Sequence, residues 1–194
     1  MEILKVQQEL RSLKSPEYAA HYQRFFKTGP GEYGFGDIFL GIRVPIVRNL
    51  AKKFSALKLD KIKVLLTSSY HEERFLALVI LVLQYNKKDL QTKKEIYRFY
   101  LKYRKHINNW DLVDTSAHHI VGCHLYNKKD RIILNELAQS NLLWDRRIAI
   151  IATFYFIKND QYEDTLSLSR WLLFDKEDLI HKAVGWMLRE IGKR

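Results

Sequence analysis

Apolar residues recur at intervals of three and four along almost the whole chain, and no segment keeps the strict alternation of a half-buried strand. This spacing places apolar side chains on one face of a helix, so the sequence predicts an all-α protein. The expected helices span residues 2–13, 17–27, 45–54, 60–67, 71–85, 89–106, 110–125, 129–139, 143–158, 161–173 and 177–192.

One segment, Thr28 to Gly41, interrupts the helical pattern and holds five of the eight glycines. A glycine-rich stretch can hold a phosphate group, but here no strand precedes it and no GK[ST] motif follows it. We therefore expect an ordered loop that Tyr33, Phe35 and Phe39 anchor to the rest of the fold.

The chain also contains a repeat of 36 residues. An ungapped alignment at this period superposes four segments, 74–79, 110–115, 146–151 and 182–187. Their fourth positions are Ala77, Val113, Ala149 and Gly185, which are small enough for close helix packing. About two helices fit in each period, which predicts an α-solenoid of HEAT-like or armadillo-like repeats forming one domain over residues 1–194.

The fifth position of the repeat holds Leu78, Asp114, Ile150 and Trp186. A carboxylate at an otherwise apolar position is costly unless it is paired, so Asp114 either has a structural partner, such as a neighbouring arginine, or has a catalytic role. Trp110 and Trp186 fit either a site beside Asp114 or an ordinary aromatic core.

The repeat also predicts a row of cations on one face. Arg74, Arg146 with Arg147, and Lys182 stand at or beside its first position, where they would bind a phosphate backbone. The alternative is that Arg147 and Arg189 are solvated, or paired with Asp111 and Glu190 as surface ion pairs.

Composition narrows the class of protein. The formal charge of +11, from 33 Lys and Arg against 22 Asp and Glu, indicates a polyanionic partner. The single cysteine, Cys123, excludes a disulfide framework and indicates a reducing compartment. The N-terminus lacks the order of a signal peptide, and the longest apolar run, residues 75–83, is too short for a membrane span, so a soluble cytoplasmic protein is expected.

A histidine cluster is the remaining chemical candidate. His118, His119 and His124 lie close in sequence, but a regular helix points the adjacent pair to different faces, and no carboxylate stands at ligand spacing. No metal site is expected there.

Three motifs, Asn109–Asp114, Leu143–Ala149 and Lys182–Glu190, resemble those of the bacterial DNA alkylation repair glycosylases of the AlkD family, and so do segments 24–27 and 39–45. The resemblance covers nearly the whole chain and implies a right-handed solenoid of HEAT-like repeats that removes N3- and N7-alkylated purines from duplex DNA. It implies Asp114 as the catalytic residue, Trp110 and Trp186 beside it, and Arg147 and Arg189 on the DNA-facing surface. To these we add Arg146 and Lys182 from the row of cations, and Arg43 from the N-terminal motif, as DNA-binding candidates.

The chemistry that the resemblance implies needs no metal and no cofactor, and a monomer acting on alkylated duplex DNA is expected. Two features depart from the family pattern: the chain ends at Arg194 directly after the third motif, which suggests a fragment or a partner chain, and Phe25 stands where some relatives have tyrosine. Two other classes stay open, a noncatalytic DNA-binding module with a basic concave face and a protein-interaction scaffold.

Overall fold

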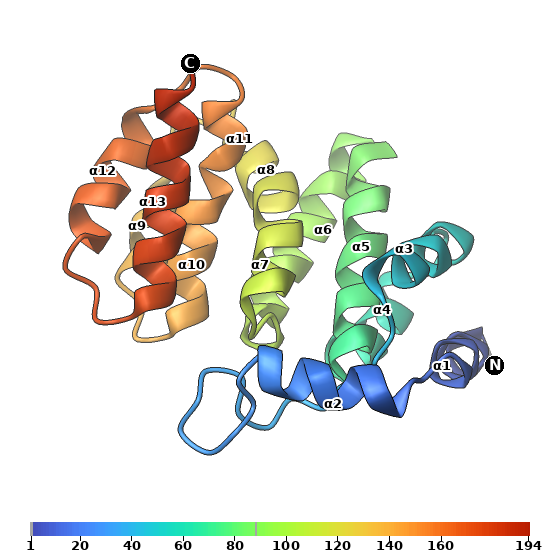
Figure 1. Ribbon diagram of the computed structural model, residues 1–194. Helices are drawn as coiled ribbons and strands as arrows, with labels where there is room; N and C mark the ends of the chain where they lie inside the picture. The colour runs from blue at the N-terminus through green and yellow to red at the C-terminus, as the bar shows by residue number, and fades with distance from the viewer. Residues whose placement is uncertain (1, 88) are drawn as a thin grey trace. The chain divides into compact units, whose positions relative to one another are not determined.

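The computed structural model describes residues 2–87 and 89–194 (Figure 1). In these residues the secondary structure is helical throughout, apart from one isolated bridge between Ile38 and Tyr70. The predicted fold class, an all-α array of helical repeats, is confirmed. The chain divides into two compact units, residues 1–89 and residues 90–194.

The first unit is built around α5. Its helices are α1 (Glu2–Ser12), α2 (Pro16–Phe25), α3 (Val44–Lys53), α4 (Leu59–Leu66) and α5 (His71–Lys87). Helix α5 is buried on nearly all sides because its central residues 75–82 are all apolar, and α3 and α4 both pack against it. The first residues of α5 are polar and also buried, so their charges need partners within the protein.

The glycine-rich loop is held by the carboxylate of Glu72. This carboxylate accepts the backbone N–H groups of Leu40 at 2.9 Å, Gly41 at 2.8 Å and Ile42 at 3.1 Å. Gly41 has φ 80°, and a Cβ there would lie 2.1 Å from the Ser15 carbonyl oxygen, so only glycine fits. The loop is therefore ordered by hydrogen bonds to a buried anion of the protein itself.

The predicted aromatic anchors of this loop are confirmed only in part. Phe39 is buried, stacking on His71 at 4.4 Å between ring centroids, and Tyr33 is half-buried. The prediction was wrong for Phe35, which is 66% exposed. Buried and exposed residues alternate from Asp37 to Phe39, which places Phe39 inward. The two glycines that flank Phe35 impose no such direction on its side chain.

The second unit is built around α10. Its helical segments are α6 (Leu90–Tyr103), η1 (Arg104–His106), α7 (Trp110–Ala117), η2 (His118–Gly122), α8 (Cys123–Leu125), α9 (Ile132–Ala138), α10 (Leu143–Ala152), α11 (Phe154–Ile157), α12 (Glu163–Leu172) and α13 (Asp178–Gly192). Every residue of α10 from Asp145 to Ala152 is buried, and the helix packs against α7, α9 and α13. Helix α10 therefore fixes the positions of the helices on either side of it.

The segment expected as one helix over 110–125 contains a π-helical turn, η2. Here Gly122 lies against α10 so closely that a Cβ would be 2.1 Å from the Ala152 carbonyl oxygen. The other small residues of the repeat behave as predicted at Ala77, Val113 and Ala149, which are fully buried. The prediction was wrong for Gly185, which is exposed with open space beside it.

Within the described residues, no helix combines the length and apolar character needed to cross a membrane.

Candidate functional site

In the first unit, the helix start of the repeat is an acid followed by an arginine, Glu73 and Arg74, and both are buried. Glu73 pairs with Arg11 at 2.7 Å. Arg74 pairs with Asp37 and donates to the Ser68 carbonyl at 2.8 Å. These charges bind elements of the unit to one another.

The second unit repeats the arrangement with Asp145 and Arg146. Asp145 pairs with Arg104 at 3.0 Å, and Arg146 pairs with Asp175 at 2.6 Å. The predicted row of cations is therefore not an open surface at Arg74, which is 3% exposed, or at Arg146, which is 8% exposed. Both guanidiniums satisfy neighbouring carboxylates, because a buried charge without a partner would cost several kcal/mol.

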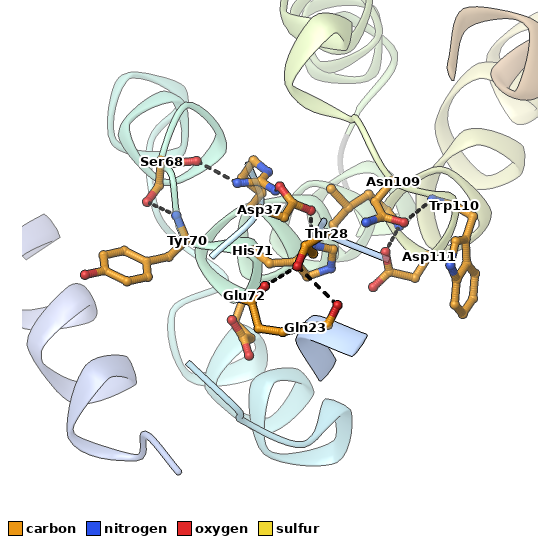
Figure 2. Close-up of polar contacts among 12 residues, drawn as sticks. Gln23, Thr28, Asp37, Ser68, Tyr70, His71, Glu72, Asn109, Trp110 and Asp111 are labelled. Carbon is orange, nitrogen blue, oxygen red and sulfur yellow. Dashed lines mark hydrogen bonds and ion pairs between the residues drawn. The ribbon is translucent and has the colours of Figure 1, made fainter. Parts of the chain in front are cut away.

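The repeat that begins α7 lacks this acid–arginine pair. Asn109 takes the place of the acid and Trp110 takes the place of the arginine. The buried Asn109 side chain accepts the backbone N–H of Trp110 at 2.8 Å, and Asp111 accepts that of Leu112 at 2.8 Å (Figure 2). These bonds satisfy N–H groups at the helix start, and the half-buried Trp110 has an indole where the repeats of α5 and α10 have a guanidinium.

Asp114, one turn after Trp110, is paired with Arg147 of α10. Arg147 Nε and Nη2 donate to the two carboxylate oxygens at 2.9 and 2.8 Å, and Nη1 donates to the Leu179 carbonyl at 2.5 Å. The Asp114 side chain is 19% exposed and that of Arg147 is 6% exposed. Through this one guanidinium, α7, α10 and the start of α13 are joined at the anomalous carboxylate, and the alternative pairing of Arg147 with Asp111 is not the one found.

Two effects act on the Asp114 carboxyl in opposite directions. Burial raises its pKa above the ordinary value, while the hydrogen bonds and the charge of Arg147 lower it. Both oxygens accept a guanidinium N–H, which is the arrangement of an ionised carboxylate. The side chain thus holds a fixed negative charge in a largely dehydrated position that solvent still reaches.

An aromatic cluster adjoins Asp114. His118 follows it by four residues on the same face of the helix. The His118 ring contacts the Phe154 ring of α11, with 5.3 Å between the ring centroids and 64° between the ring planes. The Phe154 ring in turn contacts the Trp186 ring of α13, with 5.5 Å between the ring centroids and 49° between the ring planes. Lys158 Nζ lies 4.2 Å from the Phe154 ring centroid. Trp186 is therefore linked to the Asp114 face through two intervening rings.

The imidazole of His118 is neutral. Burial, reinforced by the nearby positive charges of His119 and Lys158, lowers its pKa to about 3. The expectation that His118 and His119 point to different faces was wrong, since their ring centroids lie 3.9 Å apart. The π-helical turn that begins at His118 changes the angle between successive side chains from that of a regular α-helix.

The other predicted DNA-binding residues are exposed. Arg189 of α13 makes no ion pair among the described residues, and Lys182 pairs with the equally exposed Asp178 at 2.6 Å. In the first unit, Arg43 is exposed, with its guanidinium 5.3 Å from the Tyr18 ring centroid. Each of these side chains reaches solvent at its end, as a phosphate ligand must.

Sequence reasoning missed three contributors to this site: the contact of the His118 ring, Phe154 and the Leu179 carbonyl. The four-residue spacing from Trp110 through Asp114 to His118 was a usable signal for the histidine. Phe154 had no such signal, because Thr153 separates α10 from α11 and the segment was expected as one helix.

Comparison with known proteins places the chain. No curated protein matches it. Its structure is similar to one described as a predicted DNA alkylation repair enzyme from Enterococcus faecalis, with a TM-score of 0.68 and 19% identity over 93% of this chain and 84% of that one, a likeness in fold. A family model described as DNA alkylation repair enzyme matches residues 6–194. Because that match covers nearly its whole length, the chain belongs to the DNA alkylation repair enzyme family.

Proposed function

We propose that this family member is a monofunctional DNA glycosylase that hydrolyses the N-glycosidic bond of cationic N3- and N7-alkylated purines in duplex DNA. The observation that supports this most directly is the Asp114 carboxylate, which is largely buried and fixed at both oxygens by Arg147. A negative charge that is already oriented needs no reorganisation when positive charge develops beside it.

The reaction suits a site of this kind. An N3- or N7-alkylated purine already has a positive charge, so the electron pair of the breaking C1′–N bond neutralises the departing base. Positive charge then develops on the deoxyribose, and the carboxylate of Asp114 stabilises it. A water molecule oriented by the same carboxylate adds its oxygen to C1′ and releases a proton to Asp114 or to solvent, which leaves an abasic sugar and free base. Neither a metal nor a cofactor takes part in this scheme.

The two indoles would assist by attracting positive charge. Trp110 lies one turn before Asp114 on α7. Trp186 contacts Phe154, which contacts His118, the residue one turn after Asp114. A cation over an indole face gains roughly 0.5 to 2 kcal/mol, depending on how far the site is dehydrated. The indole faces would therefore favour an alkylated purine or a cationic sugar over their neutral counterparts.

Among the cations, we assign different roles to buried and exposed members. Arg147 orients Asp114, and the exposed Arg189, Lys182 and Arg43 would contact DNA phosphates. Arg146 is left out of the DNA-binding set because Asp175 and the Ser140 carbonyl already occupy its donors.

The closed ion pair favours a second candidate function. If Arg147 neutralises Asp114 for a structural reason alone, the chain is a noncatalytic module that binds DNA through its exposed cations. That function predicts salt-sensitive binding and no base release.

Release of free base separates the two functions. A duplex containing 7-methylguanine is incubated with the protein, and free 7-methylguanine is measured by mass spectrometry. The glycosylase predicts release by the unaltered chain and loss of release in Asp114→Asn. Asp111→Asn is the matched control, since it removes the same charge three residues away and keeps an oxygen that caps Leu112. Binding without release by the unaltered chain would support the noncatalytic module instead.

A further inference from the structure

Trp186 is held by contacts from two directions. It is only half-buried on α13, and open space lies beside the preceding Gly185, so burial alone does not fix its ring. On one side the ring meets Phe154 at 5.5 Å between centroids and 49° between planes. On its own helix, one turn later, lies Glu190, whose pKa is lowered by Lys193, at 2.6 Å, and also by the Trp186 side chain.

Phe154 is in turn held by His118. The imidazole meets the phenyl ring at 5.3 Å and 64°, which is the edge-to-face arrangement that aromatic rings favour. Phe154 belongs to the four-residue α11, a short helix that gives its side chain little support of its own. A ring from η2 therefore sets the position of a ring on α11, which contacts the indole on α13.

A histidine is energetically unfavourable at the buried position 118. It is 8% exposed, and its Nδ1 is a buried atom that has no hydrogen-bond partner among the described residues. A buried polar atom without a partner costs about 1 to 3 kcal/mol, and an apolar side chain would avoid that cost. What the imidazole supplies at this position is a flat ring that contacts Phe154, which an aliphatic side chain would not supply.

We propose that His118 and Phe154 are positioning residues that set the Trp186 indole relative to Asp114. The inference rests on the proposed function: an indole held at a fixed angle acts on the charge that develops as the glycosidic bond breaks. DNA binding, which depends on exposed cations, does not need this orientation. This relay of ring contacts, from His118 through Phe154 to Trp186, therefore governs the rate of base release from bound DNA. It leaves the affinity for undamaged duplex unchanged.

The indole N–H resonances test the positioning directly. The chain has four tryptophans, so a ¹H–¹⁵N spectrum shows four indole signals, and Trp186→Phe identifies the one from Trp186. We expect Phe154→Leu and His118→Ala to shift the Trp186 signal and to leave those of Trp144 and Trp171 in place. Phe154→Tyr and His118→Phe keep a ring at each position and should retain the original signal.

Phe156→Leu is the matched control. Phe156 lies two residues after Phe154 and is fully buried, so its truncation destabilises the fold at least as much, but its ring contacts are with Tyr126 and Arg131. This variant should leave the Trp186 signal unmoved. A purely structural role for Phe154 predicts the same pattern in both variants.

Kinetics then test the consequence. In single-turnover release of 7-methylguanine, Phe154→Leu should be slower by about 10- to 100-fold, the range expected for a misplaced catalytic group, with a Kd for undamaged duplex within twofold of the unaltered chain. Phe156→Leu should keep its rate once corrected for the folded fraction.

The outcomes separate the two proposals. An unmoved Trp186 signal in both Phe154→Leu and His118→Ala would overturn the relay whether or not base is released. A moved signal with an unchanged rate would overturn its role in the reaction while glycosylase activity stands. A Trp186 signal that shifts in both variants, together with no base release by the unaltered chain, would leave the positioning intact and refute the proposed function.

Discussion

Replacing Arg147 with methionine should destabilise the protein strongly. Arg147 is 6% exposed, and the Asp114 that loses its partner is 19% exposed, so the lone carboxylate stays largely dehydrated. Breaking a buried pair costs about 3 to 5 kcal/mol, and the partial exposure of Asp114 places this pair near the lower limit, about 3 kcal/mol. Asp114→Asn should cost less, about 2 kcal/mol, because an amide oxygen still accepts one guanidinium N–H and the Leu179 carbonyl keeps the other end of Arg147.

The double variant tests the reasoning. With both charges removed, no unpaired buried ion is left, so we expect a loss of about 3 kcal/mol in place of the additive 5, which is a coupling energy of about 2 kcal/mol. Urea unfolding at neutral pH, followed by circular dichroism, measures all four proteins. The exposed pair Lys182 and Asp178 is the control cycle and should show no measurable coupling. Additive losses at Asp114 and Arg147 would refute the account of this pair.

Three further predictions concern pH, DNA binding and the loop. The pKa of His118 is about 6.5 in the unfolded chain and about 3 in the folded protein, so the free energy of unfolding should fall as the pH drops below about 6.5. The expected slope is up to about 1.4 kcal/mol per pH unit. Urea titrations between pH 7 and 5 should show this slope in the unaltered chain and its loss in His118→Phe. Arg189→Ala should weaken binding of all duplexes alike and reduce the slope of log K against log salt by about 1, measured by fluorescence anisotropy; a change limited to one sequence would contradict a phosphate contact. Glu72→Gln should cost about 2 to 3 kcal/mol, because its amide N–H₂ faces backbone donors, and should speed hydrogen exchange at the Gly41 amide; unchanged exchange would show that the loop is held by other contacts.

The helical fold was predictable because apolar spacing depends on local geometry. Helix packing buries the same face in every repeat, so the 36-residue period also exposed Asp114 as an exception among Leu78, Ile150 and Trp186. The family resemblance was visible for a related reason, since its three main motifs lie in the helices α7, α10 and α13 that the period aligns.

The partners of the charged residues were not predictable. Arg74, Arg146 and Arg147 stand at or beside one repeat position and look alike in sequence, yet each pairs with a carboxylate that lies 29 to 37 residues away. Such pairing depends on how helices stack, which spacing along one helix does not specify. The ring contact between His118 and Phe154 was hidden for the same reason, together with a π-helical turn that has no simple sequence pattern.

The central claim is that the fixed charge of Asp114 drives base release, and single-turnover kinetics test it most directly. With protein in excess over a 7-methylguanine duplex, the release rate of Asp114→Asn is compared with that of the unaltered chain, and Kd is measured on the undamaged duplex. The account predicts a rate lower by about 100- to 1000-fold, the usual effect of removing one preorganised electrostatic group, with Kd nearly unchanged. An Asp114→Asn protein that releases base within threefold of the unaltered rate would contradict it.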